Sequence, residues 1–149
     1  MWRQGLTRFI GLSWNERGLL LEAGYSLALA QLIIWLVPFK RVASLVGRRV
    51  SQAPAMELTP LQIQTAQRVG WAVRVMATLT PWDSRCLAQA LAAKAMLKGR
   101  HLPGILMLGV AKSAREPAKV EAHAWVRAGS DVLTGGPGHE RFAVVAIFE

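Results

Sequence analysis

The hydrophobic pattern divides the chain into a helical first half and a second half that ends in strands. Residues 19–37 form an apolar stretch whose single charge is Glu22, and their length and composition predict a long helix. A second helix is expected over residues 42–49. After a proline-containing linker at residues 53–60, apolar side chains recur at helical spacing over residues 61–79, which predicts a third helix.

The second half begins with a strongly helical segment. Residues 86–98 are rich in alanine, leucine and methionine, which favour helix, and Gly99 follows as a helix stop. Four short apolar or alternating runs come next, separated by loops and glycine-containing turns, which is the pattern of an antiparallel sheet. These predicted strands cover residues 104–111, 120–127, 132–134 and 142–148. The pattern therefore predicts an α+β fold in which a helix precedes an antiparallel sheet.

Cys86, the only cysteine of the chain, lies where this helix begins. Asp83 or Ser84 is the expected N-cap, and with Asp83 as the cap Cys86 is the third helical residue. There it lies among unpaired backbone N–H groups at the positive end of the helix dipole, with Arg85 beside it, and these features favour a thiolate. The simpler interpretation is a small buried apolar side chain.

The strand over residues 120–127 alternates in character. Glu121, His123, Trp125 and Arg127 share one face, and small or apolar side chains share the other. An imidazole brought close to a cysteine at a helix N-terminus can accept the thiol proton and later protonate a leaving amine. Trp125 is expected either to shield that imidazole from water or to be an ordinary half-buried aromatic of the sheet.

Five short motifs, in a fixed order, extend over most of the chain. They are Leu36 with Pro38-Phe39-Lys40-Arg41, Cys86-Leu87 with Ala90-Leu91-Ala92 and Met96-Leu97, Leu108-Gly109-Val110, His123-Ala124-Trp125, and Val132-Leu133 with Gly135-Gly136. Together, their order and spacing resemble the transglutaminase-like leader peptidases of lasso peptide biosynthesis.

The resemblance implies a transglutaminase/papain-like cysteine protease core, with Cys86 as the nucleophile and His123 as its base. Such an enzyme removes the leader from a ribosomally synthesised lasso precursor and frees an amino terminus for an ATP-dependent cyclase. The chain has no room for a leader-recognition module, so the resemblance also implies a separate recognition protein. Two alternatives stay open: a catalytically silent module that binds precursor, recognition protein or cyclase, and acyl transfer to an amine.

The group that orients the histidine is not obvious from the sequence. A two-residue turn after Ala128 pairs this residue with Asp131, and pairs Val126 with Leu133. Asp131 is then about five residue steps from His123, or about 15 Å at the rise of a strand. We therefore expect Asp131 to be too far away to orient the imidazole.

Other groups are candidates for this role. In relatives the acid falls about where this chain has Gly135, so the matching position carries no carboxylate. Glu121 on the face of His123, Glu140 after the turn, or a backbone carbonyl could orient the imidazole instead. A β-bulge could also bring Asp131 back into range.

The net charge of +9 arises from 18 lysines and arginines against nine acids. The positive charges are scattered, with +5 in residues 1–50 and +4 in residues 51–149, and they are not interleaved with aromatic residues. We therefore expect no nucleic-acid partner. A solvated basic surface is the simplest interpretation, and attraction to an acidic leader, a partner protein or anionic lipid is the functional one.

Metal and cofactor chemistry finds little support in the sequence. His101, His123 and His139 are dispersed, and a single cysteine adds little to a zinc site. Residues 135–138 are glycine-rich but lack the Lys-Ser/Thr ending and the following helix of a phosphate loop. We expect no metal and no cofactor. A lone thiol cannot form an intrachain disulfide, which suits a reducing cytoplasm.

The apolar residues 19–37 allow three interpretations. They are a helix packed within a small helical unit, peripheral membrane contact through residues 19–41, or a membrane span. Glu22 and several polar residues interrupt the run, which favours the packed helix. We expect a helical N-terminal unit over residues 1–52, a peptidase core over residues 53–149, and a cytoplasmic protein with peripheral membrane association as the variant.

Overall fold

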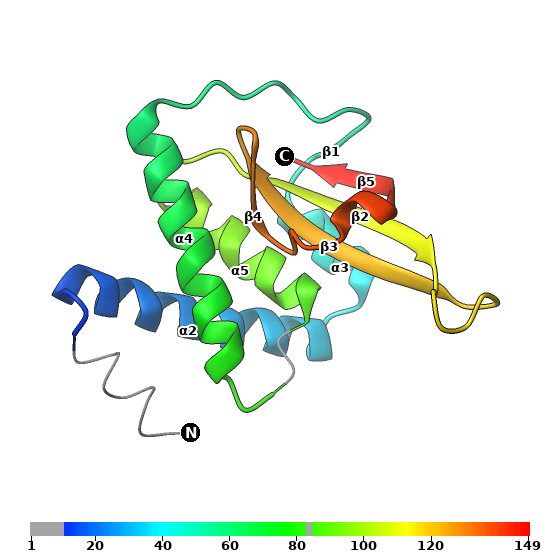
Figure 1. Cartoon of the computed structure of the whole chain (residues 1–149), viewed down its shortest axis with the longest axis horizontal. Coiled ribbons are helices and arrows are strands. Elements are labelled where there is room, and N and C mark those ends of the chain that lie inside the picture. The colour runs from blue at the N-terminus through cyan, green and yellow to red at the C-terminus, as the bar shows by residue number, and fades with distance from the viewer. Residues whose placement is uncertain (1–10, 83–84) are drawn as a thin grey trace.

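A computed structural model describes residues 11–82 and 85–149 and has the α+β fold that the sequence predicts (Figure 1). The sheet is antiparallel throughout, with the strand order β1-β5-β2-β3-β4. The described helices are α2 (Trp14–Leu36), α3 (Phe39–Val46), α4 (Pro60–Leu79) and α5 (Cys86–Gly99). The strands are β1 (Arg49–Val50), β2 (Ile105–Lys112), β3 (Val120–Ala128), β4 (Asp131–Thr134) and β5 (Ala143–Phe148), and a 3-10 turn, η1 (His139–Arg141), precedes β5.

One hydrophobic core joins the helices to the sheet. Figure 1 shows α2 along the lower edge of the molecule, and α5 contacts α2, α4 and β3. Because α2 contributes Leu20, Ala23 and Leu27 to the core that α4 and α5 share, it is built into the same packing unit. The division of the chain at residue 52 stays a prediction.

The helices of the first half begin earlier than the hydrophobic pattern predicts. The prediction that α2 starts at residue 19 was wrong, because a capping box of Ser13 and Glu16 starts the helix at Trp14, five residues before Leu19. The Glu16 N–H donates to Ser13 Oγ at 3.3 Å, and the Ser13 N–H donates to the Glu16 carboxylate at 2.8 Å. A capping box with Thr59 starts α4 in the same way.

The second helix and the residues after it also differ from the prediction. Helix α3 covers Phe39–Val46 instead of residues 42–49, and its C-cap Gly47 has a φ of 150°. The two residues of β1, of which Arg49 was expected to be helical, pair with β5 at the edge of the sheet. The sequence pattern did not predict this strand, because two residues are too few to show an alternation.

The hairpin between β3 and β4 is confirmed at its turn and corrected beyond it. Ala128 pairs with Asp131, as the two-residue turn predicts. Val126, however, pairs with Thr134 and not with Leu133, because the register shifts between Val126 and Arg127. A bulge therefore makes Leu133 the additional residue of β4, and its side chain packs against Gly70 of α4.

The single acid of the apolar stretch pairs with an arginine at the end of α5. Arg100, at the end of α5, donates two hydrogen bonds to the Glu22 carboxylate, at 2.7 and 2.6 Å. This bidentate pair lowers the pKa of Glu22 below its usual value. It also fixes the rotation of α2 about its axis, because the carboxylate must point toward α5.

Removal of this charge gives a stability test with a defined pH dependence. We expect Glu22→Gln to lower the free energy of unfolding by about 0.5–1 kcal/mol at neutral pH, since the pair is partly exposed. The folded pKa of Glu22 is lowered, so this stabilisation is present above the unfolded pKa of about 4.3 and is lost as the pH falls through the folded value.

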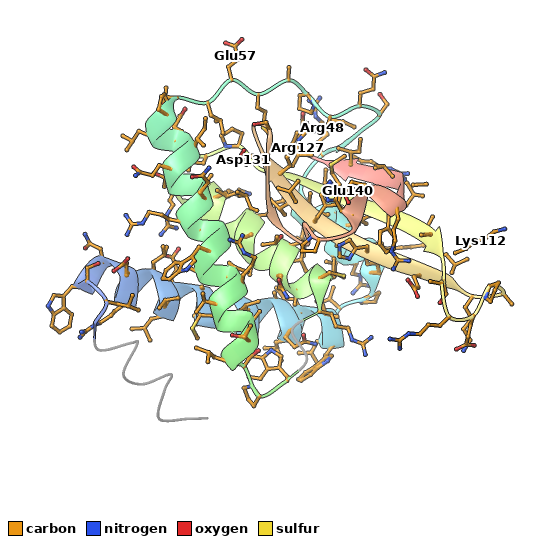
Figure 2. The ribbon with its side chains drawn as sticks, in the orientation of Figure 1. Arg48, Glu57, Lys112, Arg127, Asp131 and Glu140 are labelled. Carbon is orange, nitrogen blue, oxygen red and sulfur yellow. The ribbon has the colours of Figure 1, made fainter. Side chains whose placement is uncertain are left out.

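Urea titrations at pH 7 and near pH 3 measure the effect. Glu57→Gln is the matched control, because Glu57 projects from the exposed connection before α4 (Figure 2). An equal loss in the control, or a difference that persists at the acidic pH, would contradict the assignment.

Candidate active site

Cys86 is the first residue of α5. The prediction that it is the third helical residue was wrong, because Arg85 has the extended φ and ψ of −62° and 164° and occupies the N-cap position. Asp83 and Ser84, the caps expected from the sequence, lie outside the described residues. At the first helical position the N–H of Cys86 has no acceptor within the helix, and the partly buried side chain packs against the core. The helix N-terminus therefore remains the electrostatic environment of the thiol, as the sequence predicts.

The imidazole of His123 is oriented by a backbone carbonyl. His123 Nε2 lies 2.8 Å from the carbonyl oxygen of Gly135, and since a carbonyl oxygen only accepts, Nε2 carries the proton. Nδ1 is then the unprotonated ring nitrogen, the form that a general base needs. Of the alternatives that the sequence left open, the backbone carbonyl is the one that contacts the histidine.

Gly135 holds this carbonyl in a conformation that few other residues adopt. Its φ is 67°, and a Cβ placed there would lie 2.5 Å from the carbonyl oxygen of Ala124 and 3.2 Å from His123 Nε2. A carboxylate side chain at position 135 is therefore incompatible with this backbone. The position where the sequence resemblance places an acid is therefore the one whose backbone carbonyl contacts His123.

Two aromatic rings stack against the imidazole. The ring centroid of His123 lies 5.8 Å from that of Trp125 and 4.9 Å from that of Phe142, and both pairs are stacked. Trp125 is 3% exposed and also packs against His139 at 5.5 Å. Its ring passes so close to Gly109 that a Cβ there would lie 2.9 Å from it. The expectation that Trp125 shields the imidazole agrees with this packing.

The three candidate carboxylates have other partners. Asp131 accepts a hydrogen bond from Gln67 of α4 at 2.6 Å, and Figure 2 shows it at the turn end of the hairpin. Glu121 pairs with Arg141, and hydrogen bonds from Ser113 and Arg141 lower its pKa. Their arrangement agrees with the expectation that Asp131 does not orient His123, even though β4 contains a bulge.

Glu140, the remaining candidate, is mostly exposed. Its carboxylate lies 3.5 Å from Nδ1 of His139. Figure 2 shows it on the segment that leads into β5.

Cys86 and His123 are not joined by a hydrogen bond in the part of the chain that the structure describes. Helix α5 packs on the face of β3 that carries Ala124 and Val126. Successive side chains of a strand point to opposite faces, so the His123 side chain leaves β3 on the face opposite α5. Among the described residues, no hydrogen bond joins its ring to the Cys86 thiol. The assignment of the two residues to one catalytic pair stays a prediction.

Sequence reasoning missed two members of this cluster. Phe142 was assigned to a strand and His139 was considered only as a metal ligand, yet both pack in the cluster around His123 and Trp125. Their position soon after residues 135–138 is the only signal that could have placed them there. Within the described ranges, no group of three metal-ligating side chains comes together.

A helix that begins at the only cysteine, an antiparallel sheet and a strand with the sequence His-Ala-Trp together make up the α+β arrangement of this protein. Residues 33–146 match the family model of the transglutaminase-like superfamily. The chain therefore belongs to the transglutaminase-like superfamily, a fold compatible with cysteine peptidase activity. Comparisons with curated proteins and with solved structures gave no match.

Two glycine substitutions test the role of position 135. Gly135 and Gly138 both have left-handed φ, 67° and 75°, but only Gly135 has atoms in the way of a Cβ. We expect Gly138→Ala to cost about 1–2 kcal/mol of stability from backbone strain. Gly135→Ala should cost about 1–3 kcal/mol more, because the methyl group also overlaps its neighbours.

Chemical denaturation measures the stabilities, and nitrogen chemical shifts report the tautomer of His123. The expected result is a changed tautomer population in Gly135→Ala alone. Identical stabilities and unchanged histidine shifts in both variants would show that the carbonyl does not hold the imidazole.

Proposed function

We propose that this protein is a cysteine peptidase that removes the leader peptide from a lasso precursor. The observation that carries the proposal is the hydrogen bond from His123 Nε2 to the Gly135 carbonyl, which leaves Nδ1 as a base. Membership of the transglutaminase-like superfamily supports it, and the order of the sequence motifs supports the lasso assignment. Cys86 at a helix N-terminus supplies the nucleophile that such a base would serve.

The proposed reaction has two steps. His123 Nδ1 accepts the Cys86 proton, the thiolate attacks the carbonyl of the last leader residue, and the N–H of Cys86 donates to the oxyanion. The imidazolium then protonates the leaving nitrogen, which becomes the amino terminus of the core peptide. Water, deprotonated by His123, hydrolyses the thioester, releases the leader as an acid and restores the thiol.

This mechanism requires a hydrogen bond between Cys86 and His123 that the structure does not contain among its described residues. Cys86 Sγ and His123 Nδ1 must come within hydrogen-bond reach when substrate is bound, as catalytic hydrogen bonds often do. The hydrogen bond to Gly135 O fixes the tautomer without adding charge, so the imidazolium of the proposed intermediate lacks the carboxylate that stabilises it in triads. We expect slower turnover than in a relative with an acid at this position.

The proposed partners follow from the chemistry of the step. The leader would be delivered by a separate recognition protein, and the freed amine would be consumed by an ATP-dependent cyclase. The chain's net charge of +9 favours a leader or a recognition surface that carries acidic residues. Reduced thiol chemistry suits the cytoplasm as the place of reaction.

A catalytically silent module is the second candidate function. Two observations favour it. Position 135 carries no carboxylate, and the His123 side chain leaves β3 on the face opposite α5. In that case the transglutaminase-like fold would bind precursor, recognition protein or cyclase without cleaving a bond.

Cleavage by purified components separates the two functions. Precursor and recognition protein are incubated with the parent chain, Cys86→Ala or His123→Ala, and products are measured by mass spectrometry. We expect each substitution to lower the cleavage rate at least about a thousandfold, because nucleophile and base act as a unit. Undiminished cleavage by Cys86→Ala would exclude the peptidase, and precursor binding without cleavage by the folded parent would favour the silent module.

Neutralising Asp131 tests which group orients the histidine. Because Asp131 bonds Gln67 and pairs with Ala128, we expect Asp131→Asn to cleave within about twofold of the parent. Glu121→Gln, which removes the acid on the face of His123, should behave in the same way. A loss of several orders of magnitude in either folded variant would mean that a carboxylate orients the imidazole during catalysis.

A further inference from the structure

The side of α2 that faces away from the core is apolar along most of its length. Its exposed positions recur every three or four residues, and no charge lies among them between Leu21 and Leu36. The opposite side, with Leu20, Ala23, Leu27 and Ala30, is buried in the core. A surface helix normally has polar residues on its solvent side, so α2 lacks the pattern of a helix that faces water alone. The exposed members are Leu21, Tyr25, Leu29, Leu32, Trp35 and Leu36.

Helix α3 extends this surface. Phe39 and Leu45 are both exposed, and a groove of about 290 Å³ separates α3 from α2 and α5. Leu29 and Leu45 belong both to the exposed surface and to the lining of the groove. We call this combined surface of α2 and α3 the apolar face. Contiguous apolar surface of this kind on a folded protein indicates an interaction site.

The charge beside the apolar face has one sign. The sequence has no acid between Glu22 and Glu57, and the Glu22 carboxylate is bound by Arg100. Lys40 and Arg41 are exposed at the start of α3, and Lys98 lies at the groove. Aromatic side chains next to lysine and arginine are the composition that favours the interface of an anionic bilayer.

We propose that the apolar face binds the surface of an anionic lipid membrane, with α2 lying in the plane of the bilayer. By length and composition alone, α2 is long and apolar enough to span a bilayer. Its buried side and the Glu22–Arg100 pair nevertheless commit it to the core, which leaves only the outer side for lipid. An interfacial helix of this kind inserts its apolar side among the headgroups and attracts them with basic residues.

The composition of the apolar face favours lipid over protein. Among its exposed side chains on α2, only Tyr25 and Trp35 carry a hydrogen-bonding group, whereas protein interfaces make about one hydrogen bond per 100–200 Å². A second copy of the chain would bring another net charge of +9 against this one. A bilayer needs neither shape complementarity nor paired hydrogen bonds, and it supplies the opposite charge.

Vesicle binding by the full chain tests the proposal. Sedimentation is measured with vesicles of phosphatidylcholine alone and with phosphatidylglycerol added at one part in four. We expect binding to the anionic vesicles that weakens in high salt, and little binding to the neutral ones. The double variant Lys40→Gln, Arg41→Gln should weaken binding about 25-fold, because each lost charge should weaken it about fivefold. Leu32→Gln with Leu36→Gln should weaken it about tenfold or more.

Matched variants make the test specific. Leu61 of α4 is 71% exposed and Leu36 is 72% exposed, so Leu61→Gln controls for loss of any surface leucine. Lys112→Gln controls for charge, because Lys112 lies at the far end of the sheet from α2 (Figure 2). Both controls and Cys86→Ala should bind like the parent, which separates this proposal from the peptidase activity. Circular dichroism establishes that every variant is folded.

Three results would overturn the proposal. The first is equal sedimentation of the parent with neutral and anionic vesicles, or none with either. The second is a loss in Leu61→Gln as large as that in the α2 variant. The third is unchanged vesicle binding in the α2 variant together with loss of a dimer or of binding to the recognition protein, which would assign the apolar face to a protein partner.

Discussion

The close packing of α5 against its neighbours is the constraint on which the rest of the structure depends. The buried side chains of this helix are mostly alanines, and they let α5 approach α2, α4 and β3 at short range. Ala124 and Ala128 present equally small side chains from β3. Lys94 adds a polar tie, since its ammonium donates to the carbonyl of Gly104 at 2.7 Å. The position of the α5 N-terminus, and therefore of Cys86, follows from this packing.

Much of the fold could be predicted from the sequence because its periodicities are clear. The predicted strands of the long hairpins and the helix after the linker were found with small shifts of their ends. What the pattern could not predict were features set by single contacts: the capping box of Ser13, the two-residue strand at Arg49–Val50, and the bulge at Leu133. The site was harder to predict, because every residue has a backbone carbonyl that could orient a histidine. Only the fold determines that Gly135 provides it.

The two surfaces proposed to have a function are built by different means. Around His123, rings from β3 and from the residue before β5 hold a polar group in a partly buried cluster. Helix α2 packs one side against the core and leaves apolar side chains exposed on the other side. Because α5 contacts both α2 and β3, the two surfaces belong to one packed body.

The carbonyl of Gly135 has a consequence for how this site can change over time. A triad that uses an acid can be lost by a single substitution that leaves the backbone intact. In this protein no functional side chain exists at that position, and the orienting oxygen is placed by the path of residues 135–138. Loop length and backbone torsion therefore determine which group contacts His123. An insertion or deletion there would alter the histidine's environment while every side chain of the site stayed the same.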